Sequence, residues 1–248
     1  MRRFLPLLGF LLLPACTFLP RPAPVPVPTE THEPEGKADE LVILLPGRHS
    51  LPSEFRREGF LELVRGKHPS ATIVAPDLHI GYYRNRSATE RIHRDLVVPA
   101  REAGIRDVTL VGISMGGLGA VLYDLEHPGM AKSLVLLSPF LGDEEVIEDI
   151  RASSGLESWR PKGPEPDGFS RRVWIGLQKQ WLNGHSRPDL LLGCGRSDRL
   201  AATSKLFQRE FLNRGEAAWL AGDHNWPTWK CLYAELNRQP RVPETLEP

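Results

Sequence analysis

Short apolar runs recur along the chain, and each ends at or near glycine, proline or serine. The runs lie at 41–45, 71–75, 108–112, 133–137, 189–193 and 217–221. Runs that are apolar on both faces and closed in this way are typical of buried parallel strands. Between the runs, apolar residues recur with the spacing of a helix, for example at Leu118, Val121 and Leu125. The alternation predicts an α/β fold with a mostly parallel six-stranded sheet that carries helices on both faces.

One long segment interrupts this alternation. Residues 140–187 contain no strand pattern, but Val146, Ile150, Val173 and Leu177 belong to two stretches with helical spacing on either side of a proline-rich loop. The segment is longer than a crossover helix requires. We therefore predict a small helical cap over the carboxyl edge of the sheet, at about 140–187. An ordinary crossover helix with a long loop is the alternative.

The first forty residues differ in composition from the rest of the chain. A basic start, an apolar stretch over 4–13 and a small residue at Ala15 predict a secretory signal peptide over residues 1–15. The apolar stretch is shorter than the roughly 18 residues that cross a bilayer. Alternating prolines then predict an extended linker at residues 16–40. The folded domain is expected over residues 41–240, with a short tail at 241–248.

Composition and charge narrow the classes of function. Lysine plus arginine and aspartate plus glutamate are equal at 31 each, so the basic excess that drives nucleic-acid binding is missing. The three cysteines have no C-x-x-C spacing, which excludes a zinc ribbon, and they are too few for a disulfide scaffold. No metal or organic cofactor is implied. Cys194 and Cys231 are compatible with a disulfide or with two separate thiols.

The residues that carry candidate chemistry follow the predicted strands. Ser114 lies in Gly-Ile-Ser-Met-Gly, between an apolar run and a helical pattern, and a serine on such a sharp turn needs small neighbours. A serine nucleophile also needs a base, which in turn needs an acid. His224 follows the last apolar run and Asp198 follows the fifth. Because parallel strands end at one edge, the pattern predicts a triad of Ser114, Asp198 and His224.

The motif and the chain order of these three residues resemble the α/β-hydrolase fold family. The stretch Gly222–Pro227 is similar to the G-x-H-[DN]-W ending of esterase-like members, and the resemblance covers roughly 41–238. It implies an oxyanion hole made by the backbone N–H of Met115 and that of Gly47 or Arg48. The family's antiparallel first strands are expected to be missing, because the residues before the first apolar run have the composition of a linker.

Two loops at the predicted edge offer candidate substrate contacts. His49 follows the first apolar run, and Tyr82, Tyr83 and Arg84 follow the second. Tyrosine and arginine side chains there would suit a polar or anionic part of a substrate. The alternative is a solvated loop in which the arginines pair with neighbouring acids.

The end of the predicted signal peptide resembles that of a bacterial lipoprotein. Cys16 directly follows a small residue, and the resemblance implies that it is lipidated and anchors an exported protein to the cell envelope. Plain secretion is the alternative. Taken together, the features predict an exported serine hydrolase that cleaves a small-molecule ester or thioester. An acyltransferase with the same triad and a non-catalytic binding lipoprotein are the other hypotheses. The sequence indicates no protein partner.

Overall fold

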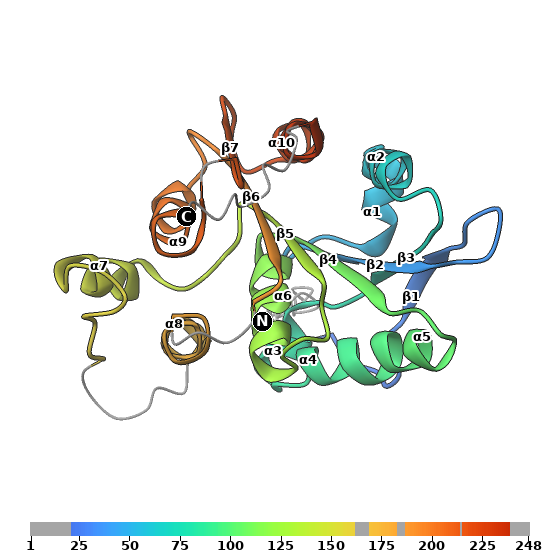
Figure 1. The fold of residues 1–248 in the computed structure, drawn as a ribbon, viewed down its shortest axis with the longest axis horizontal. Helices are drawn as coiled ribbons and strands as arrows, with labels where there is room; N and C mark the ends of the chain where they lie inside the picture. Colours follow the sequence, from blue (N-terminus) through green and yellow to red (C-terminus); the bar gives the residue numbers. More distant parts are fainter. Residues whose placement is uncertain (1–20, 162–168, 183–186, 214, 239–248) are drawn as a thin grey trace, which may run out of the picture.

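The computed structural model describes residues 21–161, 169–182, 187–213 and 215–238, and its centre is a twisted sheet. Within these ranges seven strands form one sheet in the order β1-β3-β2-β4-β5-β6-β7 (Figure 1). The strands are β1 (Thr29–His32), β2 (Glu40–Leu45), β3 (Ala71–Pro76), β4 (Asp107–Ile113), β5 (Ser133–Leu137), β6 (Asp189–Gly195) and β7 (Ala217–Leu220). All neighbouring pairs are parallel except β1 and β3. The predicted α/β class is confirmed.

Helices cover both faces of this sheet (Figure 1). One face carries α1 (Pro52–Arg57), α2 (Phe60–Lys67) and α10 (Trp226–Arg238). The other carries α3 (Ile80–Arg84), α4 (Ala88–Arg91), the π-helical η1 (Ile92–Val97), α5 (Val98–Glu102), α6 (Met115–Glu126), α8 (Phe169–Gln180) and α9 (Ala201–Phe211), with α7 (Glu144–Ala152) further out. Among the described residues, no helix is both long and apolar enough to cross a membrane.

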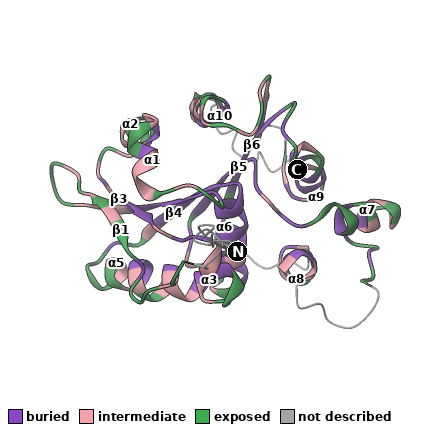
Figure 2. Ribbon diagram, turned by 180° about the vertical axis from the view of Figure 1, so that it is seen from behind, coloured by how far each residue is buried: buried purple, intermediate pink, exposed green. Residues whose placement is uncertain are grey.

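Five of the six apolar runs form the inner strands of the sheet, and the sixth forms the edge strand β7. Each of the six runs forms a strand, with only Ala221 beyond the end of β7. Every residue of β5 is buried, as are all residues of β4 after Asp107. Figure 2 shows these central strands in the colour of buried residues. Strands that are covered by helices on both faces need apolar side chains on both faces, which explains why the runs do not alternate.

The sheet has one strand more than the six that the sequence predicts. Thr29–His32 forms β1, which pairs antiparallel with β3, so that Thr29 lies opposite Pro76. An antiparallel strand therefore does precede the parallel ones, and the expectation that it would be missing is wrong. β1 lies at the edge of the sheet and its side chains are exposed or half-buried, so its sequence is polar and lacks the apolar run of an inner strand.

Residues 21–28, which we call the N-terminal strap, lie against the domain. The backbone N–H of Val27 donates to Asp95 at 2.8 Å, and the Val27 side chain is buried. Tyr82 donates its hydroxyl to the Pro24 carbonyl at 2.8 Å, and His79 bonds to the Pro22 carbonyl at 2.9 Å. Proline has no N–H, but its carbonyl still accepts hydrogen bonds. The described part of the predicted linker is therefore a packed element of the domain, whereas Cys16 and the predicted signal peptide lie outside the described residues.

The segment predicted as a cap contains the two expected helices, α7 and α8. Figure 1 shows α8 beside α6, in the layer that covers one face of the sheet, with α7 beyond it. Trp174 of α8 is fully buried and donates its indole N–H to the Leu141 carbonyl at 2.5 Å. The described part of this segment thus widens a helical layer instead of forming a separate cap over the carboxyl edge. Residues 162–168 and 183–186 lie outside the described residues.

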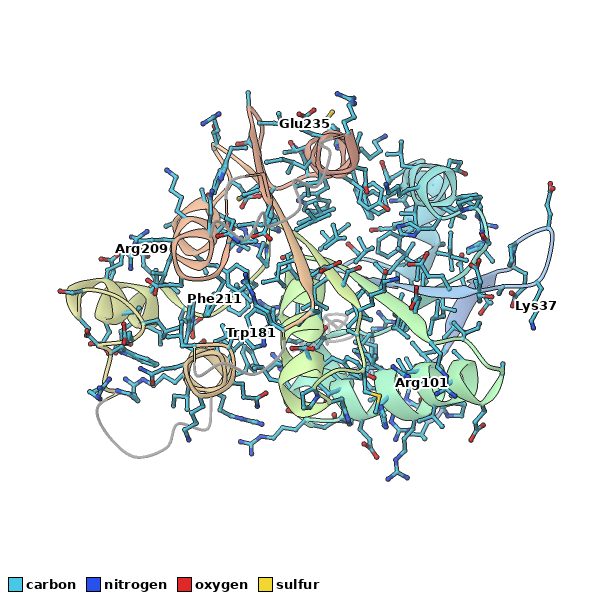
Figure 3. All side chains as sticks on the ribbon, in the orientation of Figure 1. Lys37, Arg101, Trp181, Arg209, Phe211 and Glu235 are labelled. Atoms are coloured by element: carbon cyan, nitrogen blue, oxygen red, sulfur yellow. The ribbon has the colours of Figure 1, made fainter. Side chains whose placement is uncertain are left out.

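A buried carboxylate lies where α6 meets this segment. Asp124 is 1% exposed, and Trp181 donates its indole N–H to Oδ2 at 3.0 Å. The second oxygen, Oδ1, has no hydrogen-bond partner among the described residues. Figure 3 shows Trp181 near Phe211, and the two rings meet edge-on at 5.3 Å. Burial raises the pKa of Asp124 to about 6, because the single indole N–H offsets only part of the lost hydration.

We expect Asp124→Asn to stabilise the protein at neutral pH. The folded state holds a proton on Asp124 more tightly than the unfolded state does, so this group favours folding most below about pH 4. Its contribution is lost as the pH rises towards 6, where the buried carboxylate must ionise. Urea unfolding should show a gain of about 1–2 kcal/mol at pH 7 and little gain at pH 4.

The matched control for this prediction is Glu102→Gln, which removes an exposed acid from α5. It should leave the free energy of unfolding unchanged at both pH values, because an exposed carboxylate is hydrated in both states. An equal gain for Asp124→Asn at pH 4 and pH 7 would contradict the assignment of the effect to ionisation.

Candidate active site

Ser114 occupies a strained turn between β4 and α6. Its φ of 54° and ψ of −112° lie in a region that residues other than glycine rarely adopt. The Ser114 N–H donates to the Leu137 carbonyl at 2.9 Å, and the Ser114 carbonyl accepts from Gly117 at 3.0 Å and from Phe140 at 2.9 Å. Hydrogen bonds on both sides of the residue therefore fix its backbone. The turn has the form of a nucleophile elbow, as the sequence pattern predicts.

Glycines next to Ser114 let α6 approach the sheet closely. A Cβ on Gly116 would lie 2.0 Å from the Leu45 carbonyl oxygen, and one on Gly112 would lie 2.4 Å from the Gly116 carbonyl oxygen. Both clashes are with backbone atoms, which cannot rotate away. The helix that begins at the serine can therefore pack in this position only if both residues are glycine.

We expect Gly116→Ala to destabilise the protein by about 3 kcal/mol or more, because the clash forces α6 away from β2. Gly66→Ala is the matched control, since a Cβ on this helical glycine of α2 meets nothing within 4 Å. That control should be neutral or slightly stabilising, because alanine favours the helix. Chemical denaturation of the two variants measures the difference, and similar stabilities for both would contradict the close approach.

Asp198 and His224 form a hydrogen-bonded pair. The Nδ1 atom of His224 lies 2.8 Å from Oδ2 and 3.0 Å from Oδ1 of Asp198. Asp198 lies in the turn after β6, and His224 lies in the loop between β7 and α10. The two loops are themselves joined, because the Ser197 N–H donates to the Gly222 carbonyl at 3.1 Å. The structure thus brings together two of the three residues of the predicted triad by direct contact.

The pair is arranged so that the carboxylate stays ionised. Burial alone would raise the pKa of Asp198, but hydrogen bonds from His224, the Leu200 N–H and Ser138 outweigh it and hold that pKa below its usual value. The Leu200 N–H lies 2.8 Å from Oδ1. The Asp198 side chain is fully buried, whereas 18% of the His224 side chain is exposed. One member of the pair is therefore shielded and the other reaches the surface.

The register of the sheet places Ser114 at the same edge as this pair. Ile113 at the end of β4 lies opposite Leu137 of β5, and Leu137 lies opposite Gly193 of β6. Strand β7 continues the row beside β6. The turns after these four parallel strands carry Ser114, Ser138, Asp198 and His224. They all emerge at the carboxyl edge, where ligands bind in open α/β sheets.

Two of the predicted oxyanion residues, Gly47 and Met115, lie next to Ser114. A Cβ on Gly47 would be 3.7 Å from Cβ of Ser114, so the loop after β2 passes close to Ser114 at this residue. Met115 is buried and is the first residue of α6, where backbone N–H groups lack partners within the helix. The side chain of Arg48 is exposed.

The residues predicted to contact a substrate lie in different surroundings. Tyr82 is fully buried and holds the N-terminal strap, so it belongs to the core. Tyr83 is buried with its hydroxyl against Gly119, and it forms part of the wall of a cavity that Arg84 also lines. Burial also raises the pKa of Tyr83. Arg84 is exposed and lines this cavity of about 210 Å³ between α4, α6 and α8, and His49 is exposed beside the Gly47 loop.

Ser138 is a residue of the site that the sequence analysis did not single out. It follows β5, is fully buried and has a φ of 45°. Its signal in the sequence is a serine after an apolar run, which is too common to be specific.

The two thiols of the described domain are free: Cys194 is buried, with its pKa raised to about 11 by burial, and Cys231 is exposed. Among the described residues, no cluster of three His, Cys, Asp or Glu side chains could hold a metal ion.

Comparisons with solved structures support the same architecture. An S-formylglutathione hydrolase from Staphylococcus aureus is 18% identical, with a TM-score of 0.56 over 82% of this chain and 80% of its own. FphF, a fluorophosphonate-binding serine hydrolase from the same organism, is 17% identical, with a TM-score of 0.57 over 84% and 91%. An S-formylglutathione hydrolase from Agrobacterium tumefaciens is 14% identical, with a TM-score of 0.57 over 86% and 90%. At these identities the likeness establishes the fold.

A comparison with family models extends this result from the fold to the family. No curated protein matches the chain. The model described as the alpha/beta hydrolase family, however, matches residues 42–248, which is more than half of the sequence. The match includes the elbow at Ser114 and the loops of Asp198 and His224. With the strand order, the turn after β4 and this match in agreement, the chain belongs to the alpha/beta hydrolase family.

Proposed function

We propose that the protein is a serine hydrolase that cleaves carboxylic esters or thioesters through an acyl-enzyme. The observation that carries the proposal is the hydrogen-bonded Asp198–His224 pair at the same sheet edge as the strained turn of Ser114. A serine hydroxyl is a weak nucleophile unless a base removes its proton. A partly exposed imidazole held by a buried carboxylate is suited to be that base.

In the proposed mechanism, Ser114 Oγ attacks the carbonyl carbon of the substrate while Nε2 of His224 takes the hydroxyl proton. Asp198 accepts a hydrogen bond from the Nδ1–H of His224, which leaves Nε2 free to act as base, and the carboxylate stabilises the imidazolium that forms. His224 then protonates the leaving alcohol or thiol. A water molecule, activated by the same histidine, hydrolyses the acyl-Ser114 ester and restores the free serine.

We propose that backbone N–H groups stabilise the oxyanion of the tetrahedral intermediate. Met115 would supply one of them from the start of α6, and Gly47 or Arg48 would supply the other. The short distance from Gly47 to the Ser114 side chain supports the second donor. Each such donor is worth about 3–4 kcal/mol of barrier in comparable sites, so the oxyanion hole is expected to be a large part of catalysis.

The substrate class is proposed by analogy with the structural neighbours. Two of them are named as hydrolases of S-formylglutathione, a thioester, and another is a ferulic acid esterase with a TM-score of 0.53. A fold does not fix a substrate, so these names support ester and thioester cleavage in general and no single compound.

The test is hydrolysis of p-nitrophenyl esters from acetyl to palmitoyl by the full domain, beside the variant His224→Ala. We expect turnover by the wild type and a loss of at least about a thousandfold in the variant, with the preferred chain length giving the size of the acyl site. His127→Ala is the matched control, since this histidine lies at the far end of α6, and it should retain activity. A folded wild-type protein no faster than His224→Ala on every ester would rule out simple esterase chemistry.

We further propose that the protein is exported and anchored to the cell envelope through a lipid on Cys16. The support comes from the sequence of residues 1–16 alone. Expression of the full chain in a bacterial host with labelled palmitate tests it. We expect label in the membrane fraction for the wild type and none for Cys16→Ser. Label in neither protein, with export preserved, would favour plain secretion.

A further inference from the structure

The turn after β5 carries a side chain that contacts both partners of His224. The Trp229 indole N–H donates to Ser138 Oγ at 3.3 Å, and the Ser138 hydroxyl also interacts with the Asp198 carboxylate. Asp198 holds Nδ1 of His224, and Trp229 meets the His224 ring edge-on, with the ring centroids 5.0 Å apart. Ser138 therefore links the acid that orients the histidine to the ring against which the histidine packs.

The direction of these hydrogen bonds follows from the chemistry of the groups. An indole nitrogen can only donate, so Ser138 Oγ is the acceptor towards Trp229. The single hydroxyl proton is then left for the Asp198 carboxylate or the Cys194 sulfur, and the ionised carboxylate is the stronger acceptor of the two. Asp198 Oδ1 already receives the Leu200 N–H at 2.8 Å, and His224 lies nearest to Oδ2. Hydrogen bonds from the Leu200 N–H and from His224 thus hold the carboxylate, and the Ser138 hydroxyl interacts with it from the neighbouring turn.

The backbone of Ser138 is fixed as firmly as its side chain. Its N–H donates to the Gly193 carbonyl of β6 at 2.7 Å, and its φ of 45° is strained for a residue with a Cβ. Strained and fully buried positions persist where the surrounding structure determines them, and they gather at functional sites.

We propose that Ser138 is a positioning residue for the catalytic pair, which fixes the Asp198 carboxylate and the Trp229 ring so that His224 is held in its productive orientation. The inference rests on the proposed hydrolase function. Ser138 does not touch the substrate in this scheme, so its loss should lower kcat and leave KM nearly unchanged. Other titratable groups near this cluster are Cys194 in β6, Lys205 in α9 and Asp223, the exposed neighbour of His224. Cys194 stays neutral because burial raises its pKa to about 11.

The experiment compares Ser138→Ala and Ser138→Gly with the wild type, using p-nitrophenyl acetate across pH 5–9. Both variants lose the hydroxyl, but only glycine also relieves the backbone strain. We expect kcat to fall about tenfold in both, with KM within a factor of two, as the loss of one hydrogen bond to a charged group implies. We also expect the midpoint of the acidic limb of kcat/KM to move upwards by several tenths of a pH unit, because the carboxylate is less neutralised by its donors.

Ser204→Ala is the matched control, because this buried serine lies beside Cys194 and not in the link between Asp198 and Trp229. It should retain kcat and the pH profile. Thermal unfolding of all variants separates folding from catalysis. Unchanged kcat and pH profile in both Ser138 variants would overturn the inference, and so would a loss that follows only the fraction of folded protein. A wild type inactive on every ester would instead contradict the proposed function itself.

Discussion

Ser114→Ala is expected to lower kcat/KM for ester hydrolysis by at least about 10⁴-fold, because the variant has no atom that can form the acyl-enzyme. The substitution removes only the side-chain hydroxyl. The backbone of residue 114 stays fixed by its hydrogen bonds with Leu137, Gly117 and Phe140. The fold should therefore persist, with a melting temperature close to that of the wild type. Steady-state kinetics and labelling with a fluorophosphonate probe, which bonds covalently to activated serines, measure the effect.

Two comparisons make this prediction specific to the nucleophile. Ser197→Ala changes an exposed serine one residue before Asp198, and it should retain both activity and labelling. The double variant Ser114→Ala/His224→Ala should be no slower than Ser114→Ala, because residues that act as one unit give non-additive losses. Full labelling of Ser114→Ala by the probe would show that another serine is the nucleophile.

The sequence could predict the inner part of the fold because the inner strands carry their own signal. A strand that is covered on both faces must be apolar throughout, and five such runs form β2 to β6. The sixth run forms β7, which is apolar although it lies at the other edge of the sheet and is only partly buried. Ser114, Asp198 and His224 could be selected for the same reason, since each follows one of these runs. The contact between Asp198 and His224 then follows from the topology of parallel strands, which end at one edge.

The features that were not predicted depend on side-chain directions and on long-range contacts. β1 is polar because it lies at the sheet edge, and the N-terminal strap is held by carbonyl groups, which every residue has. Tyr82 and Tyr83 are buried in α3, and of the two only Tyr83 lines the cavity beside Arg84, a difference that the spacing of the two tyrosines does not specify. Ser138 became part of the site only because β5 lies between β4 and β6, an order that the sequence does not specify.

Asp198→Asn is expected to lower kcat by about 10⁴-fold while leaving the fold intact, since the amide occupies the same volume. The hydrogen bonds explain the size of the effect. Oδ1 accepts the Leu200 N–H at 2.8 Å, and only the oxygen of an asparagine amide can do the same. The amide NH₂ group must then replace Oδ2, which lies 2.8 Å from Nδ1 of His224. This arrangement places a donor where the histidine now donates.

The histidine can satisfy that new donor only by exchanging its tautomer. Nδ1 becomes the acceptor and Nε2 carries the proton, so His224 can no longer take the proton of Ser114. Asp223→Asn is the matched control, because this exposed neighbour of His224 offers the other nearby carboxylate, and it should keep most of the activity. If Asp223→Asn proved more damaging than Asp198→Asn in kcat on p-nitrophenyl acetate, the acid would be misassigned. We expect Asp198→Asn to be the more damaging of the two. The Leu200 N–H allows the new amide only the orientation that turns its NH₂ group towards His224, and this orientation selects the inactive tautomer.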